Sequence, residues 1–222
     1  QEKKLMKTQK SSLESSHFPV MLSEIIQISS PKKGGLFLDC TFGGGGYSRE
    51  ILKFKKTNVI AVDRDDSVVS IAKNFEKKFH NRFKFCQSKF SQIDTVVNKN
   101  VDIIIFDLGI SSIQINDYKR GFSFKSRDKL NMSMGLSKIS AEDVVNNLSE
   151  SQLKLIIKVL GEETEAAIIA KNIVKARIKK KITSTNELVS IIEKSKKKNI
   201  FNKINPSTKT FQALRMFVNK EI

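Results

Sequence analysis

The 222-residue chain has no tryptophan and only two histidines, two cysteines and three prolines. So few thiol and imidazole groups cannot complete a four-ligand structural zinc site without carboxylates, and no ligand spacing is visible, so we predict no metal site. Cys40 and Cys86 each lie within an apolar, strand-like run. We therefore expect buried, reduced thiols and a cytoplasmic protein, since a reducing compartment keeps thiols free.

The chain also lacks long apolar runs, and none approaches the roughly 18 residues of a membrane-spanning helix. Residues 1–16 are polar and charged and contain no apolar signal-peptide core, so we predict a disordered tail there. Hydrophobic residues nevertheless make up 39% of the sequence, which includes 15 phenylalanines. This composition predicts a folded globular protein that associates with no membrane.

Acidic residues are in the minority: 23 Asp and Glu stand against 40 Lys and Arg, which gives a net charge of +17. The excess favours an anionic partner, with nucleic acid as the first candidate. The alternative is a lysine-rich surface that reflects a composition rich in Lys, Ile and Asn. Two lysine runs, 179–181 and 196–198, favour the nucleic-acid interpretation, because lysines neutralise phosphates without reading sequence.

Four strand-like runs occupy the first half of the chain, at residues 36–42, 58–63, 82–87 and 101–108. The second and fourth are almost continuously apolar, as expected of strands buried on both faces. Helix-like segments at 48–54 and 66–79 alternate with them. This alternation predicts a doubly wound, parallel α/β sheet.

After about residue 113 the strand signals stop and helical signals follow one another. Capping boxes are predicted at Ser140 with Asp143, Ser149 with Gln152, and Ser184 with Glu187. Asn205-Pro206 is expected to begin the last helix, with proline at its first position. That helix places Phe211, Leu214 and Val218 on one face, which we interpret as core packing.

The first chemical motif is residues 39–48, which join a predicted strand to a predicted helix and contain four consecutive glycines. Glycines let the backbone turn sharply and approach a ligand without a Cβ in the way. A flexible linker would also collect glycines, but the position between strand and helix favours a nucleotide-like ligand.

The second motif is Asp63, at the end of the second strand and twenty residues after Gly43. A carboxylate there can accept hydrogen bonds from both hydroxyls of a ribose, although an ordinary strand-end or helix-capping role is the alternative. Asp65 and Asp66 are better placed to cap the next helix. The glycines and Asp63 together do not separate S-adenosylmethionine from NAD.

The third motif, residues 107–114, follows the fourth strand and begins with Asp107. In an open sheet of strand order 3-2-1-4 the ends of strands 1 and 4 flank the ligand crevice. We therefore expect Asp107 to face the same site as the glycines. Residues 120–124 and 130–134 follow; their phenylalanines and methionines, taken alone, are more often core than pocket.

Eight segments together resemble the RsmH (MraW) family of bacterial 16S rRNA cytosine-N4 methyltransferases, in order and with near-family spacing across residues 17–222. The matching segments are 17–21, the glycine motif, 62–65, 90–91, 107–114, 120–124, 161–163 and 210–215. The resemblance implies an α/β, Rossmann-like class I methyltransferase with a parallel sheet and an inserted helical domain.

The resemblance also implies the site and the partner. It assigns contacts with S-adenosyl-L-methionine to Gly45, Gly46, Tyr47, Asp63, Phe90, Asp107 and Gln114. It implies methylation of the N4 amine of a cytidine in the decoding region, with 16S rRNA or the small ribosomal subunit as partner. The implied domains are a tail (1–16), a cofactor-binding α/β domain (17–112), a helical, RNA-binding candidate domain (113–204) and a return helix (205–222).

The chain departs from the family pattern in several places. Tyr47 stands where histidine is usual, Asn131 and Gly135 where acidic residues are usual, and Ser133 where arginine is usual. These changes alter the expected charge near the substrate. Family members continue for several more strands beyond the position of Ile222, so we expect this chain to be part of a longer protein.

Asp107 is the candidate catalytic residue. A cytosine amine is a poor nucleophile because its lone pair is delocalised into the ring, and a carboxylate that accepts its N–H would localise that pair. A role in holding the cofactor alone is an equal alternative. The residues after Asp107 supply no aromatic group, so we look to Phe122 or Phe124 to stack on the base.

Two other functions stay open at this point. A NAD-dependent oxidoreductase would use the same glycines and Asp63, but it leaves residues 107–114 and the basic helical half unexplained. A non-catalytic RNA-binding protein would result if the chain is naturally short. The target nucleotide, the form of the RNA substrate and the oligomeric state do not follow from the sequence.

Overall fold

A computed structural model describes residues 19–196 and 204–221, so the predicted tail and Lys197 and Lys198 lie outside the described residues. The chain forms two compact units. Of the described residues, the sheet unit contains 19–63 and 68–108, and the helical unit contains 64–67, 109–196 and 204–221. The predicted domain limits at 112/113 and 204/205 stay predictions.

The sheet unit has four parallel strands in the order β3-β2-β1-β4. They are β1 (Gly35–Asp39), β2 (Thr57–Asp63), β3 (Phe83–Gln87) and β4 (Ile103–Ile105). In the register, Leu38 lies opposite Ile60 on one side and Ile104 on the other. The predicted parallel Rossmann-like sheet is thus confirmed, whereas the predicted bounds of the fourth strand were too wide, since β4 spans only three residues.

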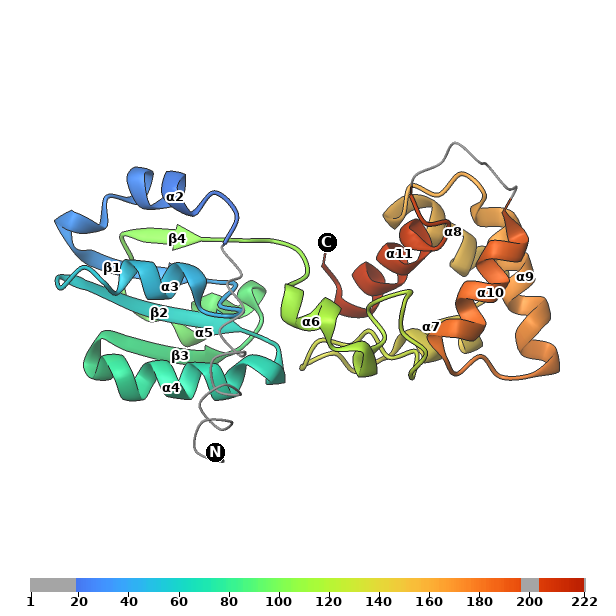
Figure 1. The fold of residues 1–222 in the computed structure, drawn as a ribbon, viewed down its shortest axis with the longest axis horizontal. Helices are drawn as coiled ribbons and strands as arrows, with labels where there is room; N and C mark the ends of the chain where they lie inside the picture. The colour runs from blue at the N-terminus through green and yellow to red at the C-terminus, as the bar shows by residue number, and fades with distance from the viewer. Residues whose placement is uncertain (1–18, 197–203, 222) are drawn as a thin grey trace, which may run out of the picture. The chain divides into compact units, whose positions relative to one another are not determined.

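Helices cover both faces of this sheet (Figure 1). They are α2 (Leu22–Ser29), η1 (Pro31–Lys33), α3 (Gly46–Ile51), α4 (Val69–Phe79), η3 (His80–Arg82), η4 (Phe90–Gln92) and α5 (Ile93–Val96). The short η2 (Asp66–Val68) begins in the segment 64–67 of the helical unit and ends at Val68 in the sheet unit. Phe37, Val59 and Ala61 pack on the side of α3 and α4. Leu38 and Val62 point the other way, toward α5, because side chains alternate along a strand.

The helical unit is built from α6 (Ser112–Asn116), η5 (Tyr118–Arg120), α7 (Ala141–Asn147), α8 (Glu150–Leu160), α9 (Ala166–Lys179), α10 (Thr185–Ser195) and α11 (Thr208–Asn219). The three predicted capping boxes begin α7, α8 and α10. The predicted start of α11 was wrong by two residues: Asn205 instead accepts the N–H of Ser207, and the helix begins at Thr208.

The core of the helical unit contains Leu130, Met132 and Met134 together with Phe211 and Leu214. The core interpretation of these methionines and of the last helix is therefore confirmed. Among the described residues, none of the helices has the length and apolar character needed to cross a bilayer. The same part of the chain holds no cluster of three or more potential metal ligands.

Candidate functional site

The ends of β1, β2 and β4 are hydrogen-bonded to one another within the sheet unit. After β1, the N–H of Cys40 donates to the carbonyl of Ile105 at 2.9 Å, and the N–H of Phe42 donates to Val62 at 3.2 Å. Between these two bonds, the hydroxyl of Thr41 accepts the N–H of Asp107 at 2.8 Å. The segment leaving β1 is therefore fixed to both neighbouring strands.

The glycine turn is joined to the end of β2. Asp63 is half-buried, and its Oδ2 accepts a hydrogen bond from the N–H of Gly43 at 2.8 Å. Gly43 has φ of 51°, and a Cβ on it would come no closer than 3.8 Å to another atom, the carbonyl of Thr41. The conformation therefore favours glycine, and the turn leaves open space beside it.

Asp39, the last residue of β1, is hydrogen-bonded to residues on both sides of the glycine turn. The carboxylate is fully buried and accepts the hydroxyl of Ser48 at 2.6 Å and the N–H of Thr41 at 3.3 Å. Burial, reinforced by the nearby charge of Asp63, raises the pKa of Asp39 to about 6 despite these hydrogen bonds. Asp39 therefore joins β1 to α3, and its position in the core suits a structural role.

Two of the predicted cofactor residues pack into the core of the sheet unit. A Cβ on Gly45 would lie 2.6 Å from the ring of Phe75, so packing already requires glycine there. Tyr47 is 6% exposed, and its hydroxyl donates to the carbonyl of Val20. Any cofactor contact from Tyr47 would thus involve its backbone, and the assignment stays a prediction. A Cβ on Gly46 would meet Pro19.

Phe90 and Asp107 present accessible groups in the sheet unit. Phe90 is 37% exposed and meets Phe106 edge to face, with ring centroids 5.8 Å apart. Phe106 is 48% exposed and directly precedes Asp107, which is also exposed. The sequence analysis did not identify Phe106 as an exposed aromatic residue near Asp107. Phe106 ends an apolar run and was included in the predicted strand at 101–108.

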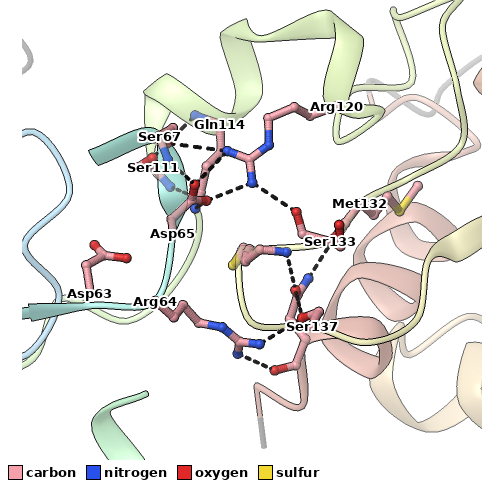
Figure 2. Close-up of polar contacts among 12 residues, drawn as sticks. Asp63, Arg64, Asp65, Ser67, Ser111, Gln114, Arg120, Met132, Ser133 and Ser137 are labelled. Carbon is pink, nitrogen blue, oxygen red and sulfur yellow. Dashed lines mark hydrogen bonds and ion pairs between the residues drawn. The ribbon is translucent and has the colours of Figure 1, made fainter. Parts of the chain in front are cut away.

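The helical unit contains a buried ion pair that the sequence did not reveal (Figure 2). Both guanidinium NH groups of Arg120 donate to Asp65, at 3.0 and 2.8 Å, and the carboxylate is 1% exposed. Gln114 donates to the same carboxylate at 2.6 Å, and the N–H of Ser67 donates at 2.9 Å. Burial would raise the pKa of this carboxyl, but the hydrogen bonds from Arg120, Ser67 and Gln114 outweigh burial and hold it below its usual value.

Both ends of the Gln114 side-chain amide are hydrogen-bonded in this structure. Its amide nitrogen holds Asp65, and its amide oxygen accepts the N–H of Ser111 in a capping box that begins α6. The predicted contact between Gln114 and the cofactor therefore stays a prediction, and the structure gives the side chain a positioning role. The spacing of Ser111 and Gln114 was the signal that could have found this box.

A second polar cluster surrounds Asn219, which is fully buried at the end of α11. Arg64, Met132 and Ser137, labelled in Figure 2, belong to this cluster. Its amide donates to the carbonyl of Met132 and its oxygen accepts the N–H of Met134, each at 2.8 Å. Arg64 donates to the carbonyl of Asn219 and to the hydroxyl of Ser137. Residues 64–67 are thereby held within the helical unit although they directly follow β2.

An open cavity of about 290 Å³ lies beside Asp65 and Arg120. Its wall also contains Asn131, Ser133 and Gly135, three of the four positions at which the sequence departs from the family pattern. Gly135 is required there by close packing, because a Cβ would lie 1.9 Å from the carbonyl of Arg64. These three departures therefore lie together at one polar surface, whereas Tyr47 is buried in the sheet unit.

Three of the four lysines of the two runs that the structure describes form ion pairs. Lys180 pairs with Glu187 and Lys181 with Glu142 at the surface. Lys196 pairs at 2.6 Å with Glu163, whose side chain is 2% exposed. Lys196 therefore has a structural role, because removing it would leave a buried carboxylate without its cation.

The two phenylalanines expected to stack on a base are packed against the core. Phe122 is 8% exposed, with the guanidinium of Arg120 at 5.0 Å from its ring centroid. Phe124 is half-buried and meets Phe211 edge to face. Neither ring presents a free face of the kind that base stacking requires.

Comparison with known proteins assigns the chain to one family. A sequence model described as the MraW methylase family matches residues 14–222. The chain is 43% identical over 211 residues to the ribosomal RNA small subunit methyltransferase H of Orientia tsutsugamushi (strain Boryong), covering 93% of this chain and 68% of that protein. It is 42% identical to the protein of the same name from Ehrlichia ruminantium (strain Welgevonden), with 93% and 70% covered. For the Brucella ovis protein of that name the identity is 40%, with 93% and 61% covered.

Proposed function

Because the chain belongs to the MraW methylase family, we propose that it transfers a methyl group from S-adenosylmethionine to the N4 amine of a cytidine in small-subunit ribosomal RNA. The observation that carries the proposal is the hydrogen-bonded junction of three strand ends. It brings the glycine turn, Asp63 and Asp107 to one edge of a parallel sheet, which is where ligands bind in open α/β folds.

The residues of this edge suit S-adenosylmethionine. Open space beside Gly43 lets a ligand approach the backbone, and Asp63 offers a carboxylate that is only half-buried. A carboxylate in that place can accept both hydroxyls of the ribose. Phe90 is exposed and supplies an aromatic surface of the kind that stacks on an adenine. When bound, S-adenosylmethionine supplies an electrophilic methyl group on its sulfonium centre.

Asp107 is the candidate that would act on the amine. Its N–H is anchored on Thr41, so the backbone that carries the carboxylate is held in place. The exposed carboxylate can accept a hydrogen bond from the amine N–H and so localise the nitrogen lone pair for attack on the methyl group. The alternative, in which Asp107 only holds the cofactor, predicts a different mutant phenotype.

Calorimetry tests the cofactor assignment. Asp63→Ala should weaken S-adenosylmethionine binding by about 1–3 kcal/mol, the cost of losing a charged hydrogen-bond partner. Asp94→Ala, which removes an exposed carboxylate in α5, is the matched control and should bind normally. Unchanged affinity in Asp63→Ala would remove Asp63 from the site, and stronger thermal stabilisation by NADH than by S-adenosylmethionine would favour an oxidoreductase.

Asp107→Asn separates the two roles of Asp107. If the carboxylate acts on the amine, methyl transfer to small-subunit particles falls while S-adenosylmethionine affinity stays near normal. If it holds the cofactor, affinity falls with activity. The relatives named as ribosomal RNA small subunit methyltransferases support the choice of substrate. We propose that the reaction takes place in the cytoplasm.

A further inference from the structure

Residues 117–129, the basic loop, carry exposed cations beside an exposed aromatic ring. They lie between α6 and α7 in the helical unit (Figure 1). Lys119, Lys125, Arg127 and Lys129 are exposed, and Tyr118 is 50% exposed. We infer that this loop is a contact surface for single-stranded RNA, with the cations on phosphates and Tyr118 stacked on a base; the inference rests on the proposed function.

The four cations are free to meet a ligand. In the part of the chain that the structure describes, no carboxylate forms an ion pair with any of these four side chains. The lysine runs differ, because Lys180, Lys181 and Lys196 each pair with a glutamate. Arg120, within the loop, is likewise committed to Asp65 and is not part of the contact surface.

Hydrogen bonds hold the loop in one conformation. The hydroxyl of Ser126 donates to the carbonyl of Tyr118 at 2.6 Å, which closes the loop on itself. From α10, Thr185 donates its hydroxyl to the carbonyl of Ser126 at 2.7 Å and its N–H to Asp128 at 3.0 Å. Gly121 allows this closure, because a Cβ there would lie 2.4 Å from the carbonyl of Lys129. A rigid loop loses little conformational entropy when it binds.

Tyr118 is the aromatic residue of this segment that can stack. Phe122 and Phe124 belong to the core or pack against it, whereas Tyr118 presents half of its surface to solvent. Its backbone is fixed through Ser126 and through the N–H of Lys119, which donates to the Asp117 side chain. A stacking ring flanked by unpaired cations is the combination that binds single-stranded nucleic acid. A double helix would offer the ring no free base face.

The experiment measures the affinity of the intact natural protein for a single-stranded fragment of small-subunit rRNA. The measurement is repeated at several salt concentrations, which gives the slope of log K against log salt. The test variant carries Lys119→Gln, Lys125→Gln, Arg127→Gln and Lys129→Gln. The matched control removes four exposed lysines of α8 and α9: Lys154→Gln, Lys158→Gln, Lys171→Gln and Lys175→Gln. Each phosphate contact on a single strand contributes about 0.7 to the slope of log K against log salt.

We expect the test variant to lose about three units of slope and roughly tenfold or more in affinity at 0.1 M salt, while the control loses less than about one unit. Tyr118→Ala should weaken binding about tenfold without changing the slope, and Tyr118→Phe should bind normally. Equal losses in test and control variants would overturn the proposal, as would a test variant that binds like the wild type.

Two further readouts separate this inference from the proposed function. S-adenosylmethionine affinity of the test variant should stay at the wild-type value, because none of the four substituted residues is among the predicted cofactor contacts. Wild-type protein that binds RNA through the loop but transfers no methyl group would refute the proposed reaction and leave the RNA surface standing. Equal affinity of the wild type for polyglutamate and for RNA would show a non-specific cationic surface and overturn the RNA assignment.

Discussion

Replacing Arg120 by methionine should change how acid affects the stability of the helical unit. Acid weakens the contribution of Asp65 to stability in the wild type, but it should stabilise the variant. Methionine keeps much of the length of the side chain but removes the cation that faces Asp65. The carboxylate is 1% exposed, so it cannot recover the lost interaction from water. The variant also loses the bond from the guanidinium to the carbonyl of Ser133 at 2.9 Å and the contact with Phe122.

The expected cost is about 3 kcal/mol at neutral pH. Removing one partner of a buried ion pair costs about 3–5 kcal/mol. The lower end applies here, because Asp65 keeps its hydrogen bonds from Gln114 and Ser67. In a double-mutant cycle with Asp65→Asn, the second substitution should recover part of this loss, since it removes the buried charge.

The sign of the pH effect follows from the direction of the pKa. In the wild type the pKa of Asp65 lies below its usual value, so its contribution to stability is present at neutral pH and is lost as the pH falls through that lowered pKa. Without Arg120, burial dominates and the pKa rises above the usual value. Acid then protonates the buried carboxylate, which removes the free-energy cost of the unpaired charge and makes the variant more stable.

Urea unfolding followed by far-UV circular dichroism at pH 7.5 and pH 4.5 measures this effect. The stability difference between wild type and Arg120→Met should be about 3 kcal/mol at pH 7.5 and clearly smaller at pH 4.5. Arg127→Met, which changes an exposed arginine in the same loop, is the control and should change stability by less than about 0.5 kcal/mol at either pH. A difference for Arg120→Met that does not vary with pH would refute the reasoning.

Three further predictions concern the sheet unit. The pKa of Asp39 is about 6 in the folded protein against an ordinary 3.8, so its contribution to stability falls as the pH rises from about 4 to 6, by up to about 3 kcal/mol. Asp39→Asn should flatten that slope in urea titrations; an unchanged slope would contradict the assignment. Thr41→Val should lower methyl transfer about fivefold, because Asp107 loses its anchor, and Thr41→Ser should restore it; equal activity in all three proteins would rule out the anchor. Gly45→Ala should lower the melting temperature through its clash with Phe75, with a loss of about 2 kcal/mol; a stable variant that only fails to bind cofactor would show that the glycine serves the ligand instead.

The order of the strands could be predicted because it depends on local patterns and general rules. Continuous apolar runs marked strands buried on both faces, and helices alternated with them. The hydrogen-bonded ends of those strands contain Asp63 and Asp107, which the sequence had already placed at strand ends. Capping boxes were predictable for the same reason, since their partners lie three residues apart.

The roles that depend on distant partners could not be predicted. Lys196 was grouped with a lysine run expected to neutralise phosphates, but its partner, Glu163, lies 33 residues away and is buried. The bond between Arg120 and Asp65 spans 55 residues. Gly45 was assigned to ligand space, and only the fold shows that the ring of Phe75 already fills the place of its Cβ.

The hydrogen bonds of Asn219 have a consequence for the order of events during protein synthesis. The four strands that the structure describes all lie before residue 108, so they can pair with one another before α11 is synthesised. The bond from Arg64 to Asn219 spans 155 residues, and the bond from Met134 spans 85. At about 5–20 residues per second, the ribosome needs roughly 6 to 20 seconds to add the residues from 109 to 219. During that interval Arg64 has been synthesised, but Asn219, whose carbonyl accepts its hydrogen bond, has not.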